Sequence, residues 1–275
     1  MKTELLPELD MLYSHLKKGE NNFKHSQVRD LTKIGLGNGY SLIVAVDSDG
    51  GIGSRPGDFV KTDDYLVGRF AMRVPLLEIL ASGALPLAAF DTLTLPMDDH
   101  GLKIIKGIKD ELMEAGLGKD FPLSGSTEDN VPTKETGIGT MVIGIVHDRD
   151  FRPGTGVAGD VVVCLGIPKS APGDKVTIDD AQIVKLKEIR QISEKSDIHD
   201  ILPVGSHGVL YEAMKMADSA GLNFRVLENS GIDLKKSGGP GTCIILSCKV
   251  MMGKALRKLT GAPVTKIGQL EKRSI

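Results

Sequence analysis

Residues Leu42 to Asp58 read LIVAVDSDGGIGSRPGD, and the rest of the chain is organised around this stretch. Its first apolar and β-branched residues predict a short buried strand, Leu42 to Val46, which the following glycines end. That strand delivers Asp47 and Asp49 to its tip. Two carboxylates so close together repel each other unless a cation or hydrogen-bond donors hold them. A Mg²⁺ ion between the carboxylates and a phosphate would do so, and an acidic turn after a strand is the alternative interpretation.

Composition places the chain among ordinary globular proteins. Its 275 residues suggest one large domain or two ordinary ones, and 41% hydrophobic with 25% charged residues is typical of soluble proteins. The formal net charge of −2 gives no electrostatic reason to expect nucleic acid or an anionic membrane as a partner. The three cysteines lie in apolar surroundings without CxxC spacing, which favours reduced thiols in a cytosolic protein. No apolar run approaches the ~20 residues of a membrane span, and the acidic N-terminus does not resemble a signal peptide.

Hydrophobic periodicity predicts alternating helices and strands along the whole chain. A polar, glycine-rich stretch, HDRDFRPGTGVAGD at 147–160, is the expected junction between an N-terminal domain (1–150) and a C-terminal domain (151–275). The predicted helices cover residues 1–18, 65–82, 101–115, 183–194, 209–220 and 250–259. The predicted strands cover residues 29–34, 42–46, 85–95, 139–146, 161–167, 223–227, 242–247 and 264–267.

A second polar cluster, GSTEDN at 125–130, is expected as a loop between a helix and a long apolar strand. Gly125 lets backbone amides converge, and Ser126 and Thr127 add hydroxyls that suit phosphate oxygens. Glu128 or Asp129 adds a carboxylate that suits the metal of that phosphate. The alternative interpretation is a plain Asx or Ser/Thr turn between two elements.

The motif Ser206-His207-Gly208 opens a predicted helix, and a helix start is a natural anion site. Ser206 is also a suitable N-cap. His207 is a candidate base or hydrogen-bond donor to a substrate, and a solvated loop histidine is the alternative. A GxGxxG match at 154–159 precedes a strand instead of following one, so a dinucleotide fingerprint is excluded, and no P-loop or GxSxG motif occurs.

The order of these motifs along the chain carries more information than any one of them. The segments RDLT, DSDGGIGSRPGD, VGRFAMRVPLLEILASGALP, GSTEDN, PVGSHG and SGGPGTC extend from about residue 29 to residue 248. In this order they resemble the aminoimidazole ribonucleotide synthetase (PurM-like) superfamily, which includes thiamine-monophosphate kinase, selenophosphate synthase and the hydrogenase maturation dehydratase. Within the superfamily, the chain looks most like the α-ribazole kinases.

The resemblance implies a two-domain α/β (α+β) fold. The N-terminal sheet would pair with its twin to form a barrel across a homodimer, followed by a C-terminal mixed α/β domain. ATP and Mg²⁺ would be held mainly by the N-terminal domain. Asp30 and Asp47 match acidic positions of the family, whereas Glu128 or Asp129 stands only near the acidic residue of its Gly-Gly-Asp/Glu-Thr motif. The second glycine of that motif is Ser126 here, which leaves the choice of carboxylate open.

The implied activity is phosphorylation of the 5′-hydroxyl of α-ribazole by ATP in cobalamin lower-ligand salvage. The histidine in Ser206-His207-Gly208, where thiamine-monophosphate kinase has an aspartate, argues against thiamine phosphate as the substrate. Alternatives are another ATP-dependent member of the superfamily acting on a carboxamide or a different vitamin precursor, and an ATP-binding protein without catalysis. The expected site comprises Asp30, Asp47 and Glu128 on the metal, Gly125, Ser126, Thr127 and Asp49 on the phosphates, Lys61 and Arg69 as cationic helpers, and His207 on the acceptor.

Overall fold

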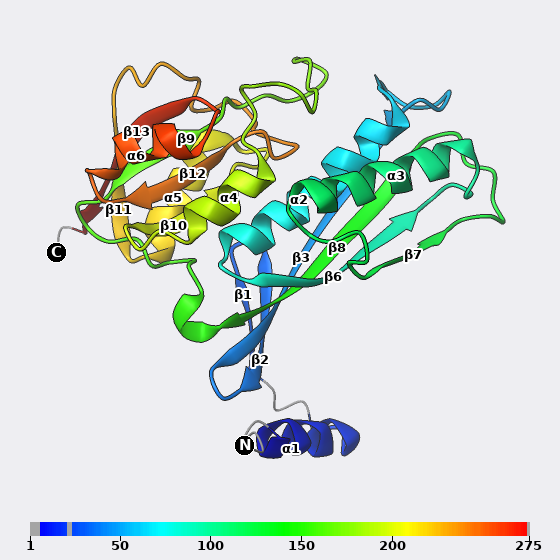
Figure 1. Cartoon of the computed structure of the whole chain (residues 1–275), viewed down its shortest axis with the longest axis horizontal. Helices are drawn as coiled ribbons and strands as arrows, with labels where there is room; N and C mark the ends of the chain where they lie inside the picture. The colour runs from blue at the N-terminus through cyan, green and yellow to red at the C-terminus, as the bar shows by residue number, and fades with distance from the viewer. Residues whose placement is uncertain (1–5, 21–23, 274–275) are drawn as a thin grey trace.

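The computed structural model describes residues 6–20 and 24–273, which form two lobes, each built on one sheet (Figure 1). The N-terminal lobe contains α1 (Leu6–Lys17), β1 (His25–Val28), β2 (Leu31–Gly37), β3 (Tyr40–Gly50), β4 (Ile52–Gly53), β5 (Val60–Lys61), α2 (Asp64–Ala81), β6 (Leu85–Leu93), α3 (Asp99–Glu114), β7 (Leu123–Thr127) and β8 (Gly137–His147). The C-terminal lobe, entered through a short 3₁₀ helix (Asp148–Asp150), contains β9 (Val161–Leu165), α4 (Leu186–Ser193), β10 (Ile198–Pro203), α5 (Gly208–Ser219), β11 (Leu222–Val226), β12 (Ile244–Cys248), α6 (Met252–Leu259) and β13 (Val264–Lys272).

The N-terminal sheet has six strands in the order β1-β2-β3-β8-β6-β7. Its centre is the long antiparallel pair β3 and β8, in register from Tyr40 opposite His147 to Gly50 opposite Gly137. Helices α2 and α3 cover one face of this sheet (Figure 1), and the opposite face exposes apolar side chains such as that of Val46. The sheet is open within one chain, so a barrel formed across a dimer stays a prediction.

Helix α2 is the structural centre of the molecule. Asp63 caps its first turn by accepting a hydrogen bond from the amide of Tyr65, as expected of an N-cap aspartate. Glycines allow α2 and α3 to pack backbone against backbone. A Cβ atom on Gly68 would lie 1.9 Å from the carbonyl oxygen of Ile104, and one on Gly107 would lie 2.1 Å from that of Tyr65. This contact holds α2 in a fixed position, with another of its faces directed at the C-terminal lobe.

The C-terminal lobe is a five-stranded sheet in the order β10-β12-β9-β13-β11. Its helices α4 and α6 share one continuous hydrophobic core with the N-terminal lobe. Arg29 joins the lobes through a buried bidentate ion pair with Asp200 on β10, whose Nη1 to Oδ1 distance is 2.9 Å. The chain thus crosses between two sheets that are packed together, and the domain boundary at residue 150 stays a prediction.

The structure confirms most of the predicted elements and extends one important strand. β3 does not end at Val46 but continues to Gly50, because its last residues pair with β8. Asp47 and Asp49 therefore lie inside the strand instead of beyond its tip. The expected loop at 125–130 is also partly wrong, since Leu123–Thr127 pairs in parallel with β6 as β7. Within the described residues, no helix combines the length and the apolar character needed to cross a lipid bilayer.

Candidate active site

A cavity of about 1100 Å³ lies between the two lobes. Its N-terminal wall is made by β3, by one face of α2, and by a segment that includes β4 and β5. Its C-terminal wall is made by α5 and by three loops, at residues 170–177, 203–207 and 237–241. These segments are far apart in the sequence, so the cavity exists only in the folded chain.

The wall provided by α2 changes from apolar to charged along the helix. Leu66, Phe70, Val74 and Glu78 line the cavity at intervals of four residues, which places them on one helix face. Leu66 lies in the first turn of α2, a helix that contacts β4, and Glu78 lies near its end, where it interacts electrostatically with Glu212 and Lys215 of α5. The cavity therefore has an apolar end at the start of α2 and a polar end at the start of α5.

Asp47 and Asp49 line the cavity between these two ends. Alternation along a strand directs both side chains to the face that carries the buried Ile43 and Ala45. Burial raises the pKa of Asp47 to about 6, and the charge of Asp49 adds to this effect. Burial likewise raises the pKa of Asp49. Two half-buried carboxylates that repel each other are suited to binding a cation.

The polar end contains residues that sequence reasoning missed. Glu78 from α2 and Glu212 from α5 line the cavity beside Asp30. Lys215 of α5 donates a hydrogen bond of 2.8 Å from its Nζ to Oδ1 of Asp30. Burial, together with the charges of Asp30 and Glu212, raises the pKa of Glu78 to about 8. The available signal was a single carboxylate inside the apolar run LLEIL of α2.

The raised pKa of Glu78 predicts a stability that depends on pH. Glu78 titrates near 4.5 when unfolded and near 8 in the folded protein, so the folded state holds an extra proton between these values. Stability should fall as pH rises through this window, because the unfolded state binds fewer protons. Glu78→Gln should therefore raise the melting temperature relative to wild type at pH 8 and change it much less at pH 5. The exposed Glu194→Gln is the control, and the same pH dependence in wild type and Glu78→Gln would contradict the assignment.

Two other predicted residues also line the cavity. Lys61 does so from β5, although its Nζ donates to the carbonyl oxygens of Arg55 (2.5 Å) and Pro56 (3.1 Å). His207 lies at the start of α5 and makes no side-chain capping hydrogen bond. Its ring instead packs against Tyr211, with centroids 4.6 Å apart. The structure thus brings five predicted residues to one cavity: Asp30, Asp47, Asp49, Lys61 and His207.

Arg69 does not line the cavity and is not placed to act as a cationic helper. It is buried between α2 and α3, where its Nε lies 2.5 Å from Oε2 of Glu111. Its Nη1 donates to the hydroxyl of Tyr65 at 2.9 Å. The guanidinium is occupied by these partners because α2 and α3 pack so closely.

The predicted phosphate cluster also lies elsewhere. Gly125, Ser126 and Thr127 belong to β7, at the sheet edge three strands from β3, and neither they nor Glu128 lines the cavity. A Cβ atom on Gly125 would lie 2.5 Å from the carboxyl of Asp91, so this glycine makes room for a buried side chain. The Glu128 carboxylate accepts hydrogen bonds from two backbone amides, those of residues 130 (2.6 Å) and 131 (3.1 Å). The cluster is therefore the end of a strand followed by a short turn, outside the cavity of this single chain, and its role in phosphate and metal binding stays a prediction.

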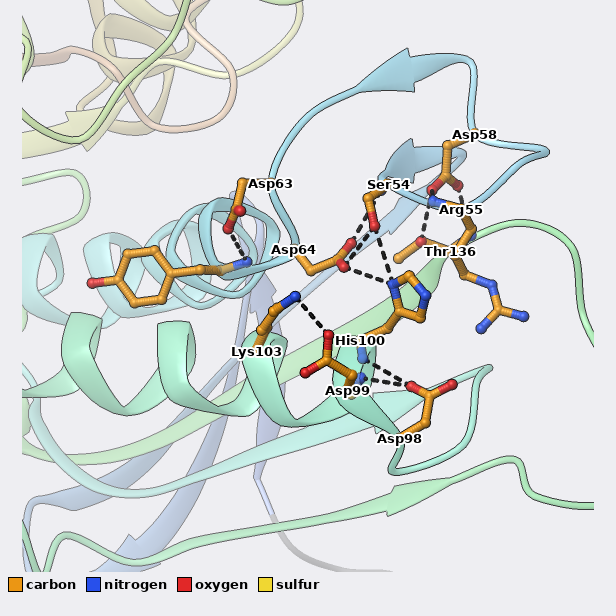
Figure 2. Close-up of polar contacts among 12 residues, drawn as sticks. Ser54, Arg55, Asp58, Asp63, Asp64, Asp98, Asp99, His100, Lys103 and Thr136 are labelled. Atoms are coloured by element: carbon orange, nitrogen blue, oxygen red, sulfur yellow. Dashed lines mark hydrogen bonds and ion pairs between the residues drawn. The ribbon is translucent and has the colours of Figure 1, made fainter.

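A polar network holds the cavity-edge loop, residues 54–59, which joins β4 to β5 (Figure 2). Ser54 donates from its backbone and its hydroxyl to the Asp64 carboxylate, at 3.0 and 2.7 Å, and Nδ1 of His100 lies 2.7 Å from the same carboxylate. Asp58 accepts from the amide of Thr136 at 2.6 Å. The loop is thus fixed to α2, to α3 and to Thr136 just before β8, and it presents Phe59, 84% exposed, beside the cavity.

Metal binding by protein groups alone is not prepared in this structure. Across residues 6–20 and 24–273, no three histidine, cysteine, aspartate or glutamate side chains are grouped so as to hold an ion. Mg²⁺ in nucleotide sites commonly takes only one or two carboxylates and completes its shell with water and phosphate oxygens. The half-buried pair Asp47 and Asp49 fits that kind of site.

Comparisons with known proteins agree with this architecture. Residues 31–146 match the family described as AIR synthase related protein, N-terminal domain. A selenide, water dikinase of Caldanaerobacter subterraneus subsp. tengcongensis is 24% identical over 186 residues, covering 62% of this chain and 52% of the dikinase. The chain therefore spans about half the length of the curated relative it matches.

Solved structures resemble the chain over most of its length. Thiamine monophosphate kinase from Aquifex aeolicus gives a TM-score of 0.64 at 16% identity, over 99% of this chain and 96% of that one. Hydrogenase maturation protein HypE in complex with ATP gives 0.61 at 16% identity, over 83% and 77%. The chain thus shares the fold of these solved structures, and its residues 31–146 match the model of the AIR synthase related N-terminal domain.

Proposed function

We propose that the protein is an ATP-dependent small-molecule kinase that phosphorylates the 5′-hydroxyl of α-ribazole. The observation that carries this proposal is the cavity between the lobes, with an apolar end, a half-buried aspartate pair in its middle and hydrogen-bonding side chains at its other end. The names of the similar proteins support it, since two are kinases and one was solved with ATP.

The order of side chains in the cavity suggests how ATP would lie. Ile52, Phe59 and Leu66 at the apolar end suit the adenine ring. The phosphates would then extend past Asp49 and Asp47 towards Asp30. Asp47 would hold Mg²⁺ together with its neighbour Asp49, with Asp30 as a further ligand, and the ion would neutralise charge on the β- and γ-phosphates.

The acceptor would approach the γ-phosphate from the α5 end of the cavity. Its hydroxyl oxygen forms a bond to the γ-phosphorus as the bond from that phosphorus to the β–γ bridging oxygen breaks, and ADP leaves. The proton of the hydroxyl is released in the same reaction. His207 lines this end of the cavity, and we assign it to orienting the hydroxyl or accepting its proton.

The test is direct. Purified protein with ATP, Mg²⁺ and α-ribazole should yield ADP and α-ribazole 5′-phosphate in a one-to-one ratio. Mass spectrometry measures both products. Calorimetry that detects no nucleotide binding in the presence of Mg²⁺ would refute the kinase proposal altogether. Tight ATP binding without product from α-ribazole or other vitamin precursors would instead favour a non-catalytic ATP-binding protein.

We also propose that the protein is a homodimer. The N-terminal sheet leaves one face open, with Val46, Leu85 and Leu87 exposed on its strands, and contiguous apolar surface of this kind commonly marks an interface. Light scattering after size exclusion should then give twice the chain mass of 29.4 kDa. A monomer at micromolar concentration would contradict this proposal.

A further inference from the structure

One face of α5, with the residue before it, forms the polar end of the cavity. His207, Tyr211, Glu212 and Lys215 recur at helical spacing and all line the cavity. Tyr211, 46% exposed, and His207 form a tilted ring pair. Aromatic rings placed in this way offer apolar contact area to a flat ligand.

Glu212 is the unusual member of this face. Only 3% of its surface is exposed, and its carboxylate accepts a backbone hydrogen bond from Gly205. Its Oε2 atom is buried and has no hydrogen-bond partner among the described residues. A buried polar atom without a partner lowers stability, and a donor on a bound molecule would satisfy it.

The surroundings of Glu212 are negatively charged. Asp30 and Glu78 line the same end of the cavity from two other segments. Lys215 is the cation on this face of α5, and its Nζ already binds Asp30 at 2.8 Å. Glu78, with a pKa of about 8, is mostly protonated at neutral pH. An anionic substituent on a ligand bound here would therefore face the carboxylates of Glu212 and Asp30, and juxtaposed like charges are unfavourable.

We propose that Glu212 selects the acceptor by accepting a hydrogen bond through Oε2 from a hydroxyl or N–H group of a neutral or cationic molecule. The charges of Glu212 and Asp30 together disfavour an acceptor that already carries a phosphate. A nucleoside with an aromatic base fits, because its sugar supplies hydroxyl donors and its base can pack on the ring pair of His207 and Tyr211. This inference rests on the proposed kinase function and adds the residue that would select the acceptor.

The first experiment measures steady-state kinetics of Glu212→Gln with α-ribazole as the varied substrate. Loss of one charge-assisted hydrogen bond should raise KM for the acceptor by roughly 10-fold or more, with KM for ATP changed less than about 2-fold. The matched control is Asp218→Asn, which lies on the same helix, outside the cavity and in a surface ion pair with Arg273. Glu212→Gln should melt no lower than wild type, because a neutral amide replaces a buried carboxylate. An unchanged KM for the acceptor in folded Glu212→Gln would overturn the proposal.

The second experiment tests how a negative charge on the acceptor changes its use by the wild-type protein. α-Ribazole and its 3′-phosphate both keep a free 5′-hydroxyl and differ by one phosphate. Wild-type protein should use the 3′-phosphate with a kcat/KM at least about 10-fold lower, in keeping with the cost of opposing charges. Equal or better use of the phosphorylated compound would overturn this selection by charge while leaving the kinase function intact.

The inference can also be separated from the proposed function. If α-ribazole is not phosphorylated at all, the acceptor in the proposed function is wrong, and calorimetry without ATP decides the inference. Weaker binding of α-ribazole to Glu212→Gln than to wild type and Asp218→Asn would support the role of Glu212. Equal binding to all three proteins, or no binding to any, would refute it.

Discussion

Asp47→Asn should lower the turnover of the proposed kinase reaction by about 100-fold or more, the usual scale for losing one key electrostatic group, while the protein stays folded. Asp47 lies between the apolar and the polar ends of the cavity, where the triphosphate and its cation would meet. A neutral amide of the same shape cannot balance that positive charge. Burial already raises the pKa of Asp47 to about 6, so the charged form costs stability, and the variant should melt at or above the temperature of wild type.

The measurement is kcat at saturating ATP, Mg²⁺ and acceptor, together with a melting curve. Asp99→Asn is the matched control, since Asp99 is exposed at the start of α3 and pairs only with Lys103 in the contacts described. That control should keep wild-type turnover. Wild-type turnover of Asp47→Asn with Mg²⁺ present would refute the role of this carboxylate.

Arg73→Leu should lower the free energy of unfolding by about 3–5 kcal/mol, the cost of breaking a buried charge network by removing one partner. Arg73 is fully buried on α2, and its Nη1 donates to Oε1 of Glu111 at 3.0 Å. Its Nε donates to the carbonyl oxygen of Gly241 at 2.9 Å, and its Nη2 donates to that of Val184. Both carbonyls belong to the C-terminal lobe, so one side chain joins the two walls of the cavity.

Urea denaturation followed by circular dichroism measures this loss. The control Lys103→Met removes an exposed ion pair with Asp99 on α3, which should change stability by only about 0.3–0.5 kcal/mol. Since Gly241 lines the cavity, Arg73→Leu should also weaken acceptor binding under conditions where it remains folded. If Arg73→Leu lowered the free energy of unfolding no more than Lys103→Met does, the network of Arg73 would not hold the lobes together.

The hydrophobic pattern within each segment was sufficient to predict the helix and the strand that line the cavity. The apolar stripe of residues 65–82 and the run 42–46 are periodic over their own length, and the structure has α2 and β3 at these places. Periodicity reports which face of an element is buried, whatever it packs against. The same local evidence was insufficient for Ser124 to Thr127, because serine and glycine are weak strand formers. Those residues are a strand only because β6 lies beside them.

Some residues of the candidate site could likewise be identified from the sequence, and others only from the structure. Asp47 could be singled out because it directly follows an apolar run, and Asp30 because its place in the order of motifs resembles that of the family. Arg69 resembled a free cation in the sequence, and its ion pair with Glu111 depends on the crossing of α2 and α3. Glu78 and Glu212 are ordinary helical residues in the sequence, and only the packing of the two lobes makes them neighbours in a cavity.

The sequence by itself determined the kinds of element, their order and the acidic strand at their centre, because these depend on propensities and periodicities within a few residues. The tertiary structure alone decided which charges meet. The pKa of Glu78, the unpartnered oxygen of Glu212 and the occupied guanidinium of Arg69 each depend on a segment distant in the chain. Electrostatic energies depend on distance and burial in space, and neither quantity can be read from separation along a polypeptide.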